Sequence, residues 1–187
     1  MNLKIVNRRV KAILFAAFLT AACTLGAQQA GKMAERSGVE SAQSAAGLNI
    51  SAYTAGSSPA TLSAPDLKAM PHITVNFHDT HTNTDESYSG VRVADILARF
   101  KAPLGSDLRG KALTNYVVAT GSDGYQAVLA LAEVDPEFHP GEVIVADSMN
   151  GKPLDTHNGP LKLVVTEDKR PARSVRNLAR IELKTLN

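Results

Sequence analysis

The second half of the chain is a succession of short apolar runs separated by turn sequences, and this pattern constrains the fold more than any other feature. The runs are four to six residues long, a length typical of strands. They occupy residues 116–120, 126–131, 143–146, 161–165 and 181–186. Between them, Gly121-Ser122-Asp123-Gly124 predicts a turn, and Asn150-Gly151 is a strong hairpin signal. The pattern predicts a domain made mainly of strands.

The first half contributes two expected helices. Ser63 can cap a short helix whose first turn holds Pro65 and Asp66. A longer amphipathic helix is expected after Gly90, with its apolar positions at helical spacing: Val93, Ile96, Leu97 and Phe100. Few helices among many strands predict an α+β class with a mixed, barrel-like sheet core.

Two more strands are expected in this half. Residues 48–53 alternate enough to form a first strand, and Ile73, Val75 and Phe77 alternate with polar residues as a half-buried strand does. The polar run that follows, residues 79–87, is expected to be a surface loop.

Residues 1–27 have the form of a signal peptide. Four lysines and arginines and no acid precede the apolar run of residues 12–22. This run is well below the roughly 20 residues that span a bilayer. We expect a periplasmic or secreted protein, and we favour Sec export over a twin-arginine route through Arg8-Arg9. A lipoprotein anchored through Cys23, the only cysteine, is the alternative.

Residues 28–47 contain almost no large apolar residue, so we expect a flexible tether before a single domain at 48–187. The leader carries four of the 20 basic residues, which leaves 16 against 18 acids. A mature net charge of about −2 gives no support for a nucleic-acid partner.

Basic residues are concentrated after the apolar run 161–165: Lys169, Arg170, Arg173, Arg176 and Arg180. Such a cluster around a short turn can bind a phosphate or a carboxylate. A solvated basic face that balances nearby acids explains the same residues, and both interpretations stay open at this point.

The same stretch resembles the end of the molybdopterin-binding domain of the sulfite oxidase family. There, a His-Gly-x-Pro-Leu-Arg-Leu-Val-Val segment precedes a Lys-Ser-Val-Lys-Trp turn and an Arg-Ile-Glu-Val strand. The matching residues are Gly159, Pro160, Leu161, Leu163, Val164, Val165, Arg173, Ser174, Val175, Arg176, Arg180, Ile181 and Glu182. His157 is displaced by one residue, because Asn158 is extra. Residues 88–97 and 122–125 resemble two upstream segments of the family, so the similarity spans roughly 48–183.

The resemblance implies a function for the turn, which in such domains holds the pterin and its phosphate. The cofactor-binding residues that it implies here are His157, Arg173, Ser174, Val175 and Arg176. Molybdopterin is the cofactor that it implies.

One departure from the family affects catalysis. The family carries a cysteine whose thiolate binds molybdenum, and Phe77 or His78 stands at that position here. We therefore expect no molybdenum site of the family's kind, we assign no catalytic residue, and whether the protein is an enzyme stays open.

Three hypotheses about function remain. The favoured one is an exported module that binds a pterin-like or other small anionic ligand without metal-centred catalysis. The second is a molybdopterin-dependent oxidoreductase with altered metal ligation, in which His78 replaces the cysteine. The third is a module that interacts with a periplasmic or membrane protein. His72, His78, Asp79 and His81 are chemically adequate for zinc or copper, but a strand end with polar loop residues is the more usual explanation, and we assign no metal site.

Overall fold

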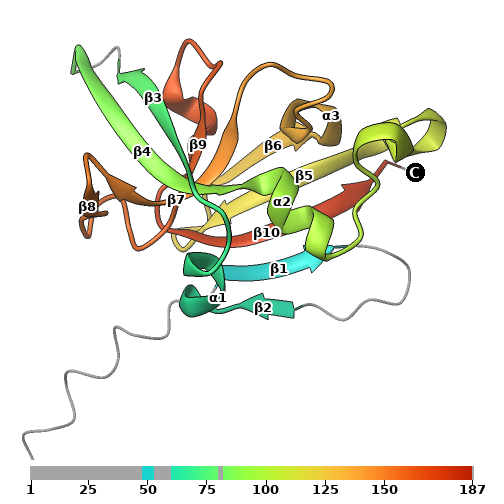
Figure 1. The fold of residues 1–187 in the computed structure, drawn as a ribbon, viewed down its shortest axis with the longest axis horizontal. Coiled ribbons are helices and arrows are strands. Elements are labelled where there is room, and N and C mark those ends of the chain that lie inside the picture. Colours follow the sequence, from blue (N-terminus) through green and yellow to red (C-terminus); the bar gives the residue numbers. More distant parts are fainter. Residues whose placement is uncertain (1–47, 53–59, 80–81, 187) are drawn as a thin grey trace, which may run out of the picture. The chain divides into compact units, whose positions relative to one another are not determined.

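The structure is a computed structural model that describes residues 48–52, 60–79 and 82–186. Of the two units into which the chain divides, residues 1–39 and 40–187, the second holds all of the described residues. The predicted signal peptide and tether lie outside the described residues. The fold of the second unit is drawn in Figure 1.

One sheet of this unit has five strands in the order β2-β1-β10-β5-β6. These are β1 (Leu48–Ala52), β2 (Ala60–Leu62), β5 (Asn115–Gly121), β6 (Gln126–Ala130) and β10 (Leu178–Thr185). The sheet is mixed, because β1 runs parallel to β10 while the other pairs are antiparallel. The central strand β10 buries Ile181 completely.

The second sheet is antiparallel and follows the order β3-β4-β7-β8, with β9 also paired to β7. Its strands are β3 (Ile73–Asp79), β4 (Thr84–Arg92), β7 (Val143–Met149), β8 (Lys152–Pro153) and β9 (Lys162–Val165). Asn150 and Gly151 join β7 to β8 with φ angles of 52° and 74°. Two consecutive positive φ angles are what a type I′ turn requires, so the predicted hairpin is confirmed.

The polar run 79–87 is not a surface loop throughout, and that prediction was wrong for Asp79, which ends β3, and for residues 84–87. Residues 84–87 belong to β4, which pairs with β3 through Phe77 and Glu86 and through His78 and Asp85. The side chain of Asp85 is 89% exposed, whereas Tyr88 further along the strand is buried. Backbone pairing does not depend on side-chain polarity, and this end of the hairpin faces solvent (Figure 1).

The helices of the described residues are short. They are α1 (Ala64–Lys68), α2 (Val93–Arg99), α3 (Leu131–Val134) and the 3₁₀ helices η1 (Gly105–Asp107), η2 (Gly110–Thr114) and η3 (Pro171–Arg173). Ser63 caps α1 as predicted, and its hydroxyl oxygen accepts a hydrogen bond from the N–H of Asp66. The α+β class with few short helices is confirmed. Within the described part of the chain, no helix has the length and apolar character that a membrane crossing requires.

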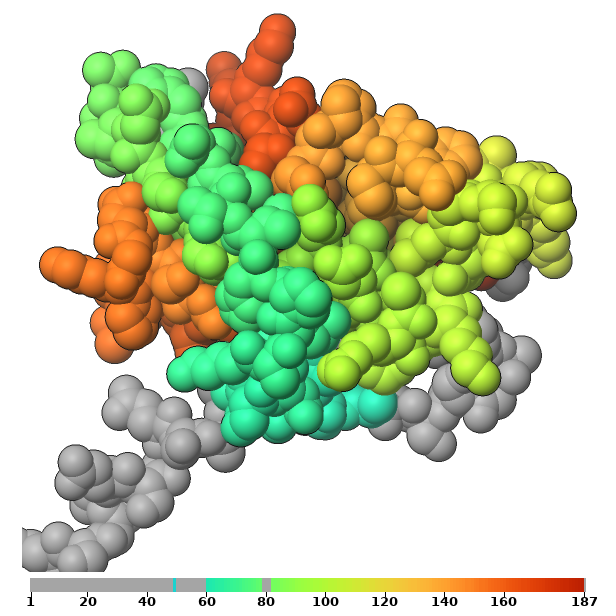
Figure 2. All heavy atoms as spheres, viewed as in Figure 1, coloured from blue at the N-terminus to red at the C-terminus, as the bar shows by residue number. Residues whose placement is uncertain are grey.

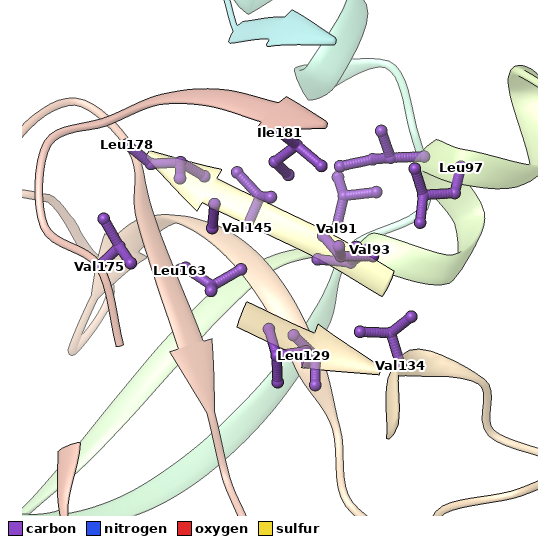
Figure 3. Packing of buried hydrophobic residues seen from close by; sticks show 14 of the residues in the cluster. Val91, Val93, Leu97, Leu129, Val134, Val145, Leu163, Val175, Leu178 and Ile181 are labelled. Carbon is purple, nitrogen blue, oxygen red and sulfur yellow. The ribbon is translucent and has the colours of Figure 1, made fainter. Parts of the chain in front are cut away.

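A shared apolar core joins the two sheets. Val145 and Leu163 of the antiparallel sheet belong to the same buried cluster as Leu178 and Ile181 of the mixed sheet, as Figure 3 shows. Val175, between β9 and β10, is fully buried in this cluster. The core therefore fixes both ends of the segment that connects β9 to β10. Elsewhere on the molecule, the orange residues around α3 lie against the yellow-green residues around η2, as Figure 2 shows.

Candidate functional site

An open pocket of about 720 Å³ lies among three segments: the turn after β5, the loop before β9 and the segment that contains η3. Its volume is in the range of small-molecule sites, about 300 to 1,000 Å³. The lining residues are Asp123, Tyr125, His157, Arg170, Pro171, Ala172, Ser174, Arg176 and Asn177. Five of these carry a charge or an imidazole or phenol group, so the pocket is suited to a polar ligand with a ring.

Asn177 ties the three segments together. Its Nδ2 donates to the carbonyl oxygen of His157 at 3.1 Å, and its backbone N–H donates to the carbonyl oxygen of Asn158 at 2.9 Å. Its own carbonyl oxygen accepts from the N–H of Ser122 at 2.9 Å. Its φ of 48° is in the left-handed region, which asparagine tolerates better than most residues. The pocket is therefore held together largely by backbone groups.

Gly159 permits this close approach. It is buried with a φ of 86°, and a Cβ there would lie 2.3 Å from Oδ1 and 2.6 Å from Cα of Asn177. No side chain fits between these two segments, so glycine is required at this position on both counts.

Two positive side chains line the pocket, and one of them contacts a histidine. Nη1 of Arg176 donates to Nε2 of His157. A guanidinium only donates, so Nε2 of His157 is the acceptor in this contact. Arg170 lines the same pocket, and both arginines are exposed. The arrangement can bind an anion through charge-assisted hydrogen bonds.

Tyr125 forms an aromatic part of the wall. Its hydroxyl donates to the carbonyl oxygen of Ala172 at 2.6 Å, and its backbone N–H donates to Oδ1 of Asp123 at 2.9 Å. The residue is still 51% exposed. The ring is thus fixed at both ends while its surface stays open to a ligand.

Arg173 serves a different purpose from Arg176. Its guanidinium donates to both carboxylate oxygens of Asp168, at 2.6 and 2.9 Å, and to Oε1 of Glu133 at 2.9 Å. The pKa of Arg173 is raised above its usual value, first by the hydrogen bonds to Asp168 and then by the one to Glu133. Two carboxylates neutralise this side chain, which links η3 to α3 and is absent from the pocket lining.

The same contact changes the titration of Glu133. Partial burial alone would raise the pKa of this carboxyl. The hydrogen bonds from Arg173 and from the N–H of Ala130 outweigh that effect, so the pKa lies below its usual value. Glu133 is therefore ionised under neutral conditions.

The structure brings three of the five sequence-predicted residues together at the pocket: His157, Ser174 and Arg176. It places the side chains of Arg173 and Val175 elsewhere, the first in the carboxylate cluster and the second in the core. Sequence reasoning did not assign Arg170, Tyr125 or Asn177 to the site, although two signals were present. Arg170 belongs to the basic cluster, and Tyr125 ends the Ser-Asp-Gly-Tyr turn. Ligand binding by these residues stays a prediction.

The two candidates for the position of the family's cysteine, Phe77 and His78, are consecutive residues of β3. Phe77 is 7% exposed and packs in a second buried cluster with Tyr88 and Ile144. His78 points to Asp85, with Nδ1 2.7 Å from Oδ1, and neither Phe77 nor His78 lines the pocket. The described lining thus offers donors for an organic anion and no soft ligand of the kind that fixes molybdenum.

The other histidines of this region are separated. His72 lies between the carbonyl oxygen of Met70 and Oδ2 of Asp147, at 2.8 and 3.2 Å. Over residues 48–52, 60–79 and 82–186, no three His, Cys, Asp or Glu side chains form a group that could hold a metal. His81 lies outside these ranges.

Comparisons with known proteins agree with this fold. The model of the oxidoreductase molybdopterin binding domain matches residues 47–186. Among solved structures, the sulfane dehydrogenase SoxCD from Paracoccus pantotrophus is similar, with a TM-score of 0.58 and 16% sequence identity. The match covers 79% of this chain and 41% of that chain, and at this identity it shows the fold alone. No curated protein matches the chain.

Proposed function

The chain belongs to the oxidoreductase molybdopterin binding domain family, as its motifs predicted, and we propose that its pocket binds a molybdopterin-type or other small anionic ligand without metal-centred catalysis. One observation carries the proposal: Arg170, Arg176 and His157 line one pocket in which the described residues supply no thiolate.

The positive charges of the pocket favour a ligand that carries an anionic group. Arginine presents its N–H groups in a planar fork that matches phosphate and carboxylate oxygens. Arg176 and Arg170 are both available from the pocket side, whereas the carboxylates near Arg173 are occupied by that residue. A phosphate-bearing ligand would complete the charge balance of the pocket.

The aromatic wall of the pocket favours a ligand that contains a flat ring. Tyr125 presents a fixed aromatic face beside Pro171 and Ala172, and such a surface favours stacking of a planar heterocycle. A pterin with a phosphate has both features that the pocket selects. In this arrangement Arg176 orients the phosphate, and Tyr125 orients the ring.

We assign no reaction step to molybdenum. The family binds this metal through a soft thiolate, and neither residue that stands at the corresponding position, Phe77 or His78, supplies one. Replacement by His78 has no support from the geometry, because this side chain is hydrogen-bonded to Asp85 on the β3–β4 hairpin outside the pocket. A bound molybdopterin would supply a dithiolene group, and the described residues around the pocket would bind and orient it.

The location of the protein is part of the proposal. The basic leader and short apolar run of residues 1–27 support export to the periplasm or the medium, with a lipid anchor on Cys23 as the alternative. The small anionic ligand is the proposed partner. No contact of the described residues favours the protein-interaction hypothesis over ligand binding.

Direct titration tests the proposal. The full chain is titrated with a pterin that carries a phosphate and with the same pterin without it. We expect the phosphorylated form to bind at least tenfold more tightly, and we expect Arg176→Ala to remove this preference. Arg99→Ala, on the exposed side of α2, is the matched control and should bind as the wild type does. Equal binding of both pterins, or none, would contradict the proposal.

A further inference from the structure

We infer that anion binding in this pocket is coupled to protonation of His157, so that affinity for an anion rises as the pH falls. The inference rests on the proposed function, because it concerns the same pocket. It concerns regulation of the pocket by pH, which ligand binding alone does not require.

The first step is the state of His157 without an anion. Nε2 of His157 accepts a hydrogen bond from Nη1 of Arg176, and only a neutral imidazole can accept. In this state one donor of Arg176 is used within the protein. One N–H group of Arg176 is then not available to hydrogen-bond a ligand in the pocket.

The second step is the effect of a proton. An imidazolium donates from both nitrogens, so its contact with Arg176 is lost and replaced by repulsion between two cations. Histidine is the side chain that ordinarily changes charge between about pH 5 and 8. Protonation of His157 therefore releases a donor of Arg176 and adds a further donor and a third positive charge to a pocket that Arg170 and Arg176 already line.

The third step is that the two cations stay near one another. Nδ2 of Asn177, the neighbour of Arg176, holds the carbonyl oxygen of His157, and its N–H holds that of Asn158. Gly159 packs directly against Asn177. These hydrogen bonds do not involve the side chains of His157 and Arg176, so repulsion between those two side chains does not separate the two segments. An anion between the side chains relieves it.

Other charged groups around His157 are compatible with this coupling. Asp155 precedes it in the same loop, and the hydrogen bond from the backbone N–H of Asn158 is the main reason that the pKa of Asp155 is lowered. Asp155 is therefore ionised whenever histidine titrates, and it favours the proton. Of the other charged residues that line the pocket, Arg170 is positive and Asp123 is negative. An added anion changes this balance in the direction of protonation.

The coupling between anion binding and His157 depends on a feature in which this chain departs from the family segment. Relative to the family segment, Asn158 displaces His157 by one position, and the carbonyl oxygen of Asn158 is one of the two that Asn177 holds. By thermodynamic linkage, the protein must take up protons when it binds an anion that prefers the form with a protonated His157.

Calorimetry with sulfate tests the inference, because sulfate keeps its charge from pH 5 to 8. The full chain is titrated at pH 5.5 and at pH 8.0 at the same ionic strength. We expect at least about fivefold tighter binding at pH 5.5, since two unit charges about 4 Å apart in water already produce an effect of that size and sulfate carries two negative charges. Near pH 6.5, the heat should differ between buffers of different ionisation enthalpy, because protons are taken up.

Two variants separate His157 from the other histidines. His157→Gln should bind sulfate with nearly the same affinity at both pH values, whereas His78→Gln, outside the pocket, should keep the wild-type pH dependence. Equal sulfate affinity at both pH values in the wild type would overturn the coupling and leave the proposed function intact. A pH dependence that persists in His157→Gln would also overturn it. Failure to bind sulfate and the phosphorylated pterin at either pH would overturn both.

Discussion

Nδ2 of Asn177 donates a hydrogen bond to the carbonyl oxygen of His157 at 3.1 Å, and this bond joins two segments that are 20 residues apart in the chain. The pocket is thus organised by an asparagine side chain and by backbone groups. We call this set of hydrogen bonds, together with the packing of Gly159 on Asn177, the frame of the pocket, and the charged side chains project from it. Substitutions in the frame should lower the free energy of unfolding, and substitutions of the charged side chains should weaken ligand binding.

Gly159→Ala tests the frame. The new Cβ would lie 2.3 Å from Oδ1 of Asn177 in a residue with a φ of 86°, so we expect a loss of about 2 to 4 kcal/mol in the free energy of unfolding. Gly151→Ala is the control, because its φ is 74° and nothing lies within 4 Å, and it should cost about 1 kcal/mol. Urea denaturation measures both. Equal losses would show that the two segments can separate.

Arg173 and Arg176 are predicted to act on different properties. Arg173→Ala removes the hydrogen bonds to Asp168 and Glu133 and should lower the free energy of unfolding by about 1 to 2 kcal/mol, a figure reduced for partial exposure. Arg176→Ala should change it by less than about 0.5 kcal/mol. The same urea experiment compares the two variants. A larger loss in Arg176→Ala would contradict this division of roles.

Glu133 gives a pH dependence of known sign. Its folded-state pKa is lowered from the usual 4.5, so its ion pair stabilises the fold above that pH and stops doing so as the pH falls through the folded value. Wild type should exceed Glu133→Gln in stability by about 1 kcal/mol or less at pH 6, with a smaller difference at pH 3.5. Glu167→Gln, an exposed control, should track the wild type. A difference that grows in acid would have the wrong sign.

Tyr125 separates ring stacking from hydrogen bonding. Tyr125→Ala removes the ring and should weaken binding of the phosphorylated pterin about tenfold, whereas Tyr125→Phe keeps the ring and should weaken it less than about threefold. The chain has no tryptophan, so no tryptophan emission overlaps with the pterin fluorescence that reports binding. Equal losses in both variants would indicate that the hydroxyl matters more than the ring.

Local features of the fold could be predicted from the sequence. The Asn150-Gly151 hairpin, the Ser63 cap and the apolar positions of α2 depend on neighbouring residues, and the structure has all three. The polar half of β4 could not be predicted, because its strand pairing is made by the backbone and its side chains face solvent.

The site was predictable only in part, for a related reason. A basic cluster can be read from the sequence, but the partner of each arginine cannot. Glu133 lies 40 residues before Arg173, and this pairing removes Arg173 from the lining while leaving Arg176 in it. The tie between Asn177 and His157 is likewise a long-range contact, with no local pattern to signal it.

Binding of a pterin without molybdenum is tested by the ratio of molybdenum to pterin in the full chain, purified from cells that make molybdopterin. We predict a bound pterin-type ligand, lost in Arg176→Ala and retained in Arg99→Ala, with molybdenum far below one atom per pterin. One molybdenum per pterin, lost in His78→Ala, would contradict metal-free binding and support the oxidoreductase hypothesis. Absence of both would contradict binding of the family's cofactor.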